Sequence, residues 1–241
     1  MSKVLMIIHQ RTSDTGRVGR VLEEWGYTLD IRCPLHGCSL PETMDEHEGA
    51  VVFGGPQSVH DHATLPAIRA EIDWTPRACE SGKPFLGICL GAQMLAFALG
   101  AKVAFHPAEL HEIGYTTIRP LPSWRGMLDT PRVFYQWHKE GFELPRGAEA
   151  LATGDMFPNQ AYRLNDKIYG LQFHPEVTRP IIESWTDSSS IGMKRPEAQP
   201  ADRQLADNEI HDPKIEDWCR AFLAQWIGRP NEGHNRRLST E

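Results

Sequence analysis

Short apolar runs alternate with segments of helical periodicity in the N-terminal half of the chain. Within those segments apolar residues recur every three or four positions, as at Val18, Leu22 and Trp25. Runs that are apolar throughout are typical of strands covered on both faces. Their alternation with helices predicts βαβ units in a mostly parallel sheet, with right-handed crossovers that place helices on both sides. The predicted strands comprise residues 4–8, 27–31, 50–53 and 84–88.

In the second half of the chain the apolar segments become shorter and more closely spaced. This spacing predicts a smaller, partly antiparallel section, a short helix over residues 178–185 and an amphipathic helix over 213–227. Residues 187–212 are rich in Ser, Pro, Asp and Ala and have no clear period, so we expect a long surface excursion that is a lid or disordered. These features predict a single α/β domain over residues 1–227, with a twisted central sheet, and a polar tail over 228–241.

The composition narrows the class of protein. The chain has 241 residues, of which 40% are hydrophobic and 24% charged, as in ordinary globular proteins, and its net charge is −7. An acidic chain lacks the positive surface that binds a phosphate backbone, so nucleic acid is not an expected partner. The first apolar run is too short for a signal peptide or a membrane span. We therefore expect no binding to a membrane. The five cysteines do not have the spacing of a disulfide framework, so we also expect a cytoplasmic protein.

A candidate nucleophile lies where the fourth predicted strand meets a helix. The sequence from Gly87 to Gly91 is Gly-Ile-Cys-Leu-Gly, which is a nucleophile elbow with sulfur in place of oxygen. Such a turn presents Cys89 above the edge of the sheet. The N-terminus of the next helix then favours a thiolate through its free N–H groups and its dipole. The alternative is a buried structural cysteine, because glycines also flank cysteines by chance.

A thiolate nucleophile requires a base, and His174 and Glu176 form a candidate pair. On an extended segment residues i and i+2 point to the same side, so Glu176 can orient His174 and stabilise its charged form. Pro175 between them indicates the end or the edge of a strand. The alternative is a surface histidine beside a surface glutamate, a strong alternative in a chain with 11 histidines.

Gly54 and Gly55 follow a predicted buried strand and are candidates for binding an anion. Glycines let backbone N–H groups approach a ligand closely, so the amides of Gly55 and Leu90 would together hold an oxyanion. The alternative is an ordinary Gly-Gly-Pro turn. Cys33 and Cys38, with a histidine between them, suggest a metal site, but zinc normally requires a fourth ligand and a different spacing. We therefore expect a plain loop there and no metal.

Taken together and in this order, the three segments are far more specific than any one of them. They resemble the class I (triad) glutamine amidotransferases, and in particular free-standing proteins similar to the amidotransferase domain of GMP synthase. The resemblance implies a flavodoxin-like fold, with a mostly parallel central sheet flanked by helices. The segments that carry it are residues 53–56, 87–93 and 170–176, supported by residues 112–115, 136–140 and 158–162.

The resemblance implies an enzyme that hydrolyses the side-chain amide of glutamine. Cys89 would attack the amide carbon, His174 would pass a proton to the departing ammonia, and Glu176 would orient His174. Water would then release glutamate from a γ-glutamyl thioester. The amides of Gly55 and Leu90 would form the oxyanion hole, and no cofactor would be needed. The residues implied to bind glutamine are Gln93, Trp137, His138 and Glu140.

Two features leave alternatives open. Lys139 and Glu140 stand where relatives more often have Gly and Asp, so a stand-alone γ-glutamyl hydrolase or peptidase with the same triad is an alternative to a glutaminase. The sequence has neither a Ser-Gly-Gly-x-Asp-Ser loop nor a P-loop to activate an acceptor, so ammonia used in synthesis would pass to a separate synthetase subunit. A catalytically silent regulatory protein on the same scaffold is the third interpretation.

Overall fold

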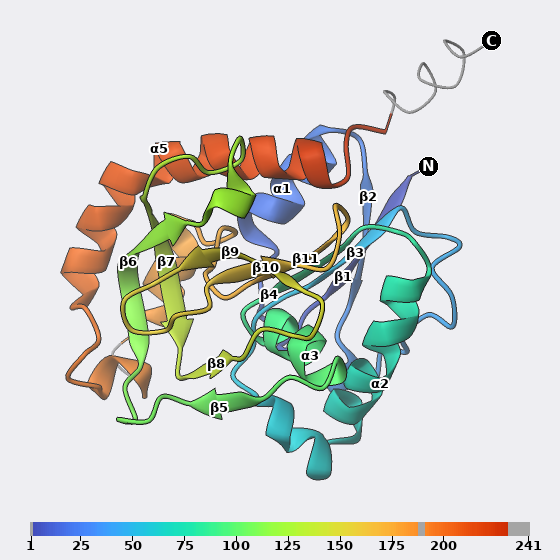
Figure 1. Ribbon diagram of the computed structural model, residues 1–241, viewed down its shortest axis with the longest axis horizontal. Coiled ribbons are helices and arrows are strands. Elements are labelled where there is room, and N and C mark those ends of the chain that lie inside the picture. The colour runs from blue at the N-terminus through green and yellow to red at the C-terminus, as the bar shows by residue number, and fades with distance from the viewer. Residues whose placement is uncertain (1, 188–190, 231–241) are drawn as a thin grey trace.

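The computed structural model describes residues 2–187 and 191–230, and its centre is a nine-stranded sheet (Figure 1). Five neighbouring strands of this sheet pair in parallel. The strands β1, β3, β4 and β11 are apolar and almost wholly buried, because helices cover both faces of a parallel sheet. In spatial order the parallel strands are β2 (Thr28–Arg32), β1 (Lys3–Ile7), β3 (Gly49–Val52), β4 (Phe85–Ile88) and β11 (Ile168–Leu171).

The sheet continues beyond β11 with four strands that pair antiparallel. The predicted antiparallel section is therefore an extension of the central sheet. The order of the parallel strands is that of flavodoxin-like doubly wound sheets, which confirms the predicted fold class. The antiparallel strands are β10 (Ala161–Arg163), β9 (Glu149–Thr153), β6 (Glu112–Pro120) and β7 (Arg132–His138), and a separate pair is formed by β5 (Val103–Phe105) and β8 (Glu140–Phe142).

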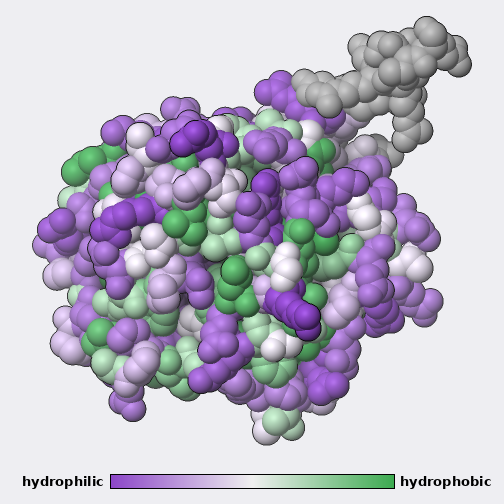
Figure 2. All heavy atoms as spheres, viewed as in Figure 1, coloured by the Kyte–Doolittle hydropathy of each residue, from purple (hydrophilic) through white to green (hydrophobic). Residues whose placement is uncertain are grey.

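The surface is mixed in polarity. Figure 2 shows apolar residues scattered among polar ones over the face seen in Figure 1, which is normal for protein surface in contact with water. Among the described residues, no helix combines the length and the apolar character needed to cross a membrane. Short 3₁₀ helices connect several elements, namely η1 (Pro34–His36), η2 (Val59–Ala63), η3 (Pro122–Trp124) and η4 (Gly192–Lys194).

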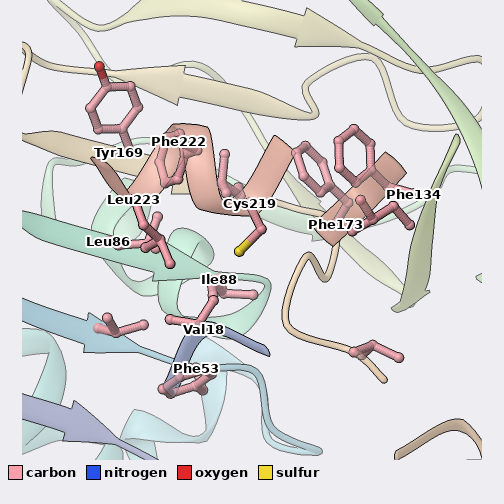
Figure 3. Packing of buried hydrophobic residues seen from close by; sticks show 14 of the residues in the cluster. Val18, Phe53, Leu86, Ile88, Phe134, Tyr169, Phe173, Cys219, Phe222 and Leu223 are labelled. Atoms are coloured by element: carbon pink, nitrogen blue, oxygen red, sulfur yellow. The ribbon is translucent and has the colours of Figure 1, made fainter. Parts of the chain in front are cut away.

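Two hydrophobic layers hold the strands in place. On one face α1 (Gly16–Glu24) and α5 (Ala201–Trp226) pack on the sheet, and on the other face α2 (Pro66–Glu80) and α3 (Leu90–Ala98) do so. Figure 3 shows Cys219 and Leu223 of α5 close to Leu86 and Ile88 of β4. Each large apolar side chain buried in this way contributes about 1.5–3 kcal/mol, so the strand ends are anchored by packing on both sides.

The C-terminal helix differs from the prediction. The short helix α4 (Arg179–Trp185) lies where expected, but α5 begins at Ala201, well before the predicted start at residue 213. The expectation of a surface excursion over residues 187–212 is therefore wrong for its second half. Pro213 lies inside the helix, although proline is more common in the first turn, where its missing N–H costs nothing. Residues 231–241 of the predicted polar tail lie outside the described residues.

The physical reason for this difference is that the first half of α5 buries a polar face. Gln204 and Asn208 are almost fully buried, so apolar periodicity leaves this half of the helix undetected. The hydroxyl of Tyr135 donates to Oε1 of Gln204 at 2.6 Å, and Nδ2 of Asn208 donates to the hydroxyl of Tyr115 at 2.9 Å. These bonds satisfy the buried polar groups and join α5 to β6 and β7.

Candidate active site

A cavity of about 510 Å³ opens at the carboxyl ends of the parallel strands. Doubly wound sheets bind ligands at this edge, beside the strand where the order reverses, which here is β1. The lining includes Gln10 after β1, Gly54 and Gly55 after β3, Cys89 after β4 and His174 after β11. The end of β7 and the helix α4 complete it. The fold thus brings segments from four parallel strands to one place.

Cys89 occupies the sharp turn between β4 and α3. Its backbone has φ 50° and ψ −104°, a conformation that costs a non-glycine residue about 1–3 kcal/mol and is typical of functional sites. A Cβ on Gly91 would lie only 2.0 Å from the carbonyl oxygen of Val52, so this turn requires a glycine after Cys89. The sulfur lies 3.9 Å from the carbonyl oxygen of Trp137, and the residue is 5% exposed. The predicted elbow therefore places a buried thiol at the N-terminus of a helix, beside the cavity.

His174 and Glu176 lie together in the same cavity. Nδ1 of His174 is 2.7 Å from Oε1 of Glu176, and because a carboxylate only accepts, Nδ1 carries the hydrogen. The backbone N–H of His174 donates to the carbonyl oxygen of Tyr135 at 2.9 Å, and the ring of Trp185 stands edge-on to the imidazole at 5.2 Å between centroids. These contacts fix the imidazole. Within the described part of the chain its Nε2 makes no well-aligned hydrogen bond, so this atom is available to a group in the cavity.

Two opposing effects set the charge of His174. Burial by itself lowers the pKa of His174, because a buried imidazolium loses its hydration. The negative charges of Glu176 and Cys89, together with the hydrogen bond to Glu176, outweigh burial and raise the pKa of His174 to about 10. At neutral pH the imidazole is therefore protonated. A protonated imidazole whose Nε2 makes no other hydrogen bond can donate a proton to a group in the cavity.

Gly54 is the point where the two side chains meet. A Cβ on this residue would lie 2.8 Å from Cε1 of His174 and 3.4 Å from Cβ of Cys89. The imidazole and the cysteine thus pack against the same glycine, from strands that are far apart in the sequence. A side chain at Gly54 would separate them, so this glycine is a requirement of the site and more than a turn residue.

A second buried histidine, His9, is hydrogen-bonded to Gly54. Nδ1 of His9 donates to the carbonyl oxygen of Gly54 at 3.1 Å, and Nε2 of His9 is 2.9 Å from Oε2 of Glu71. His9 and Glu71 are each 1% exposed. The sequence motifs do not include this pair. The available signal was the position of His9 at the end of the first buried strand, the edge where doubly wound sheets place functional residues.

The residues implied to bind glutamine are divided between two places. Trp137 lines the cavity, whereas Gln93, His138 and Glu140 do not. Nε2 of Gln93 donates to the carbonyl oxygen of Glu140 at 2.8 Å, and Nδ1 of His138 donates to the same oxygen at 2.9 Å. The carboxylate of Glu140 accepts from the hydroxyl of Ser58 at 2.9 Å. All three residues are buried, and Gln93 and His138 both bind Glu140. The cavity wall is formed instead by the segment after β1 and by α4, which the motifs did not indicate.

Leu90 is buried at the start of α3, and the side chain of Lys139 lies outside the cavity. Leu90 is the first residue of α3 and is fully buried, so its contribution to an anion site is confined to its backbone N–H. Lys139 adopts a backbone conformation open to any residue, since Cys89 and Glu109 are the described non-glycine residues with positive φ. Its Nζ lies over the ring of Phe105, 5.5 Å from the centroid, and the side chain does not line the cavity. A lysine is therefore accommodated here without a positive φ.

The segment from Cys33 to Cys38, a possible metal site in the sequence, forms a loop around η1. Cys33 is buried and Cys38 is exposed, and the backbone N–H of Cys38 donates to the carbonyl oxygen of Cys33 at 3.3 Å around η1. Over residues 2–187 and 191–230, no group of three or more His, Cys, Asp and Glu side chains is arranged to hold a metal ion.

Comparison with known proteins relates the whole arrangement to one family. The model of the class-I glutamine amidotransferases matches residues 15–180. The glutamine amidotransferase-like protein YfeJ of Salmonella typhimurium is 31% identical over 75% of this chain and 78% of its own length. The glutamine-hydrolysing GMP synthase of Clostridium novyi is 34% identical over 60% of this chain, and the match spans only 27% of that enzyme.

Solved structures are similar over nearly the full chain. A glutamine amidotransferase of Thermotoga maritima superposes with a TM-score of 0.86 at 26% identity, covering 94% of this chain and 98% of that one. A glutamine amidotransferase of Methylobacillus flagellatus superposes with a TM-score of 0.85 at 26% identity, covering 94% of each chain. The similarity therefore includes α5 as well as the sheet and the cavity.

Proposed function

The chain belongs to the class-I glutamine amidotransferases, and from this membership we propose that it hydrolyses the side-chain amide of glutamine through Cys89 and releases ammonia. One observation carries the proposal. The sulfur of Cys89 and the His174–Glu176 pair share one cavity, and Cys89 and His174 both pack against Gly54. A nucleophile, a base and an acid that orients the base make up a catalytic triad.

In the proposed reaction the thiolate of Cys89 attacks the amide carbon of glutamine, and the carbonyl oxygen takes up the negative charge. His174 donates its Nε2 proton to the amide nitrogen, the C–N bond breaks, and ammonia leaves a γ-glutamyl thioester behind. The neutral His174 then removes a proton from water as that water attacks the thioester. Glutamate leaves, and the thiolate and the imidazolium are restored, while Glu176 holds Nδ1–H throughout.

We place the oxyanion of this reaction at the backbone N–H groups of Gly55 and Leu90. A peptide unit is planar and trans, so the C=O of Gly54 and the N–H of Gly55 point in opposite directions. Because His9 binds the Gly54 oxygen from below, the Gly55 N–H is directed away from His9. Donors held in advance at the site of developing charge are among the largest contributions to catalysis.

Removing the buried pair His9 and Glu71, which holds the Gly54–Gly55 peptide unit, tests the assignment of the oxyanion site. Combining His9→Phe with Glu71→Leu removes both partners, so that no buried charge is left unpaired. We expect kcat for glutamine to fall by about 10–100-fold with KM changed less than about twofold, because the peptide unit loses the bond that orients it. Steady-state ammonia release measures both constants. The control is His47→Phe, which removes an equally buried histidine paired with Asp30; an equal fall in kcat there would contradict the assignment.

A second candidate function is hydrolysis of larger γ-glutamyl compounds by the same triad. The observation that favours it is the extent of the cavity, which continues past Cys89 between the segment after β1 and α4. Ligand cavities of a few hundred Å³ accept drug-sized molecules, so a leaving group larger than ammonia has room there. Lys139, the sequence feature that suggested this alternative, lies away from the cavity and no longer supports it.

Substrate comparison separates the two functions. The proposal expects glutamate and ammonia in equal amounts from glutamine, and kcat/KM at least about tenfold lower for γ-glutamyl amines and dipeptides, because a site selected for glutamine need not accept a larger leaving group. Glutamate release from each compound gives the comparison, with and without cell extract. Equal or faster cleavage of the larger compounds would favour the hydrolase, and no turnover in either condition would count against both functions.

We further propose a separate synthetase subunit as the acceptor of the ammonia. The support comes from the GMP synthase of Clostridium novyi, of which this chain matches only 27%. That relative is a much longer protein that contains a region similar to this chain. We expect the two subunits to meet in the cytoplasm, as the cysteine content suggests.

A further inference from the structure

The turn that carries Glu176 is held by one buried arginine. Arg17, at the start of α1, is 1% exposed. Its Nη1 donates to the carbonyl oxygens of Pro175 at 2.6 Å and Val177 at 3.0 Å, and its backbone N–H donates to the carbonyl oxygen of Glu176 at 2.8 Å. Three consecutive carbonyl groups of the turn thus bind a single residue. Their positions, and that of the side chain between them, depend on where Arg17 is held.

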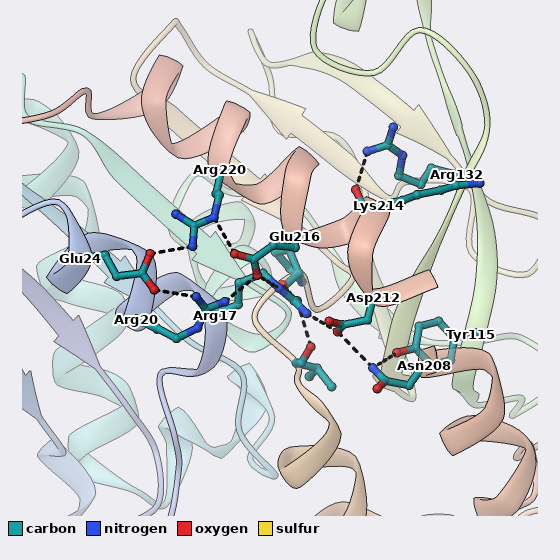
Figure 4. A network of polar contacts seen from close by, with 12 residues as sticks. Arg17, Arg20, Glu24, Tyr115, Arg132, Asn208, Asp212, Lys214, Glu216 and Arg220 are labelled. Carbon is teal, nitrogen blue, oxygen red and sulfur yellow. Dashed lines mark hydrogen bonds and ion pairs between the residues drawn. The ribbon is translucent and has the colours of Figure 1, made fainter. Parts of the chain in front are cut away.

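Arg17 is in turn held by two carboxylates of α5. Its Nε donates to Oε2 of Glu216 at 2.8 Å, and its Nη2 donates to Oδ1 of Asp212 (Figure 4). A buried guanidinium is tolerated when its charge is paired and its donors are satisfied, which these two acids and the two carbonyls accomplish. The family model ends at residue 180, so both acids lie beyond the matched region.

Glu216 has a central place in this network. It also accepts from Arg20 at 2.5 Å and from Arg220 at 2.6 Å, and Arg220 donates to Glu24 of α1 at 2.6 Å. Burial by itself raises the pKa of Glu216, but hydrogen bonds from the arginines outweigh it and lower the pKa, so the carboxylate is charged at neutral pH. The network therefore joins α1 and α5 behind the cavity.

We propose that Arg17, held by Asp212 and Glu216 of the C-terminal helix, is a positioning residue that fixes Glu176 against His174. This inference rests on the proposed function, in which Glu176 orients the base. A guanidinium has five donors in a rigid fork, so it transmits the position of α5 to the turn more directly than a flexible ammonium would. In this way α5 is part of the catalytic machinery without touching the cavity.

The test removes the carboxylates of α5 in the full chain. The variants are Asp212→Asn and Glu216→Gln, singly and combined, and the matched control is Glu209→Gln on the same helix. Glu209 is 70% exposed at its side chain and pairs at 2.8 Å with Arg179 of α4 instead of Arg17. We expect kcat for glutamine to fall by about 10–100-fold in the variants, since a misplacement of about 1 Å has effects of this size, and to remain unchanged in the control.

A pH profile distinguishes positioning from a general loss of stability. If Glu176 is displaced, it holds the proton on His174 less strongly, so the basic limb of the profile moves to lower pH. Iodoacetamide alkylation of Cys89 reports the same displacement without any substrate, so it remains informative even if glutamine is the wrong substrate. A thiolate reacts whether or not His174 is protonated, so the expected signature is slower alkylation near neutral pH. A Glu216→Gln variant that folds and whose basic limb and alkylation rate near neutral pH both coincide with those of Glu209→Gln would overturn the proposal, whether or not kcat changes. Arg17→Lys, which keeps the charge and loses the fork, is expected to show the same shift.

Discussion

Replacing Cys89 by alanine is expected to abolish ammonia release from glutamine, lowering kcat by about 10⁵–10⁶-fold. Removal of the nucleophile of a triad has effects of this size, because the remaining groups assist only direct attack by water. Steady-state ammonia release measures the loss, and mass spectrometry after treatment with a glutamine-like diazo-ketone shows whether an adduct forms. We expect one adduct on the native chain and none on the Cys89→Ala variant.

The control for this variant is Cys38→Ala, which removes an exposed thiol in a loop away from the cavity. Its turnover and its labelling are expected to match those of the native chain. A native chain that folds, turns over no glutamine or γ-glutamyl compound and forms no adduct at Cys89 would support the silent regulatory protein instead. Residual turnover of the Cys89→Ala variant at a tenth of the native rate, or more, would remove Cys89 from the mechanism.

The same position also predicts a gain in stability. Cys89 has φ 50°, where glycine is unstrained and alanine is not. Cys89→Gly is therefore expected to be more stable than Cys89→Ala by about 1 kcal/mol in free energy of unfolding, the reverse of the usual order at helix termini with negative φ. Urea unfolding of the two inactive variants measures the difference. The difference in free energy of unfolding measures the backbone strain at position 89.

Replacing Glu176 by glutamine is expected to lower kcat by about 10³–10⁴-fold, as in other triads that lose the orienting acid. Glu176 is one of the two charges that raise the pKa of His174 against the effect of burial, so without it this pKa falls well below about 10. A smaller fraction of the imidazole is then charged near neutral pH, so it attracts a negatively charged sulfur less strongly. Iodoacetamide alkylation of Cys89 from pH 6 to 10 measures the change as a slower reaction near neutrality.

The pH dependence of the free energy of unfolding provides an independent test of the role of Glu176. The pKa of His174 is raised in the folded state to about 10, so its stabilising effect is complete below the ordinary value of about 6.5 and is lost as pH rises through about 10. We expect Glu176→Gln to weaken this dependence, because one of the two charges that raise the pKa is lost. The control is Asp30→Asn, which removes the carboxylate of a different histidine pair, with His47, away from the cavity. A Glu176→Gln profile identical to that of the Asp30→Asn variant would contradict the assignment of Glu176 as the orienting acid.

The sequence predicts the fold and the meeting place of Cys89, His174 and Glu176 well, because their signals are local. Strand ends are visible as apolar runs that stop at glycine or proline, and parallel strands bring those ends to one edge of the sheet. The implied binding residues Gln93 and Glu140 were less predictable. Their side chains interact with each other and with Ser58, and a motif does not show whether a polar group faces a ligand or another part of the protein.

Residues outside the motifs complete the site, and each has a physical reason for escaping a pattern search. The N-terminal half of α5 buries Gln204 and Asn208 in hydrogen bonds, so the helix has no apolar stripe there. The sequence around His9 does not show that the histidine is buried, and its partner Glu71 lies 62 positions away. Neither position has an unusual neighbourhood in the sequence.

Local pattern was thus sufficient for the alternating strands and helices, the elbow at Cys89 and the spacing of His174 and Glu176, because period and turn chemistry act over a few residues. The contacts that hold the turn with Glu176, by contrast, depend on the tertiary structure. Arg17 and Glu216 are 199 positions apart, and their ion pair depends on α1 and α5 packing on the same face of the sheet. Attraction between charges depends on distance in space and leaves no periodic trace along the chain.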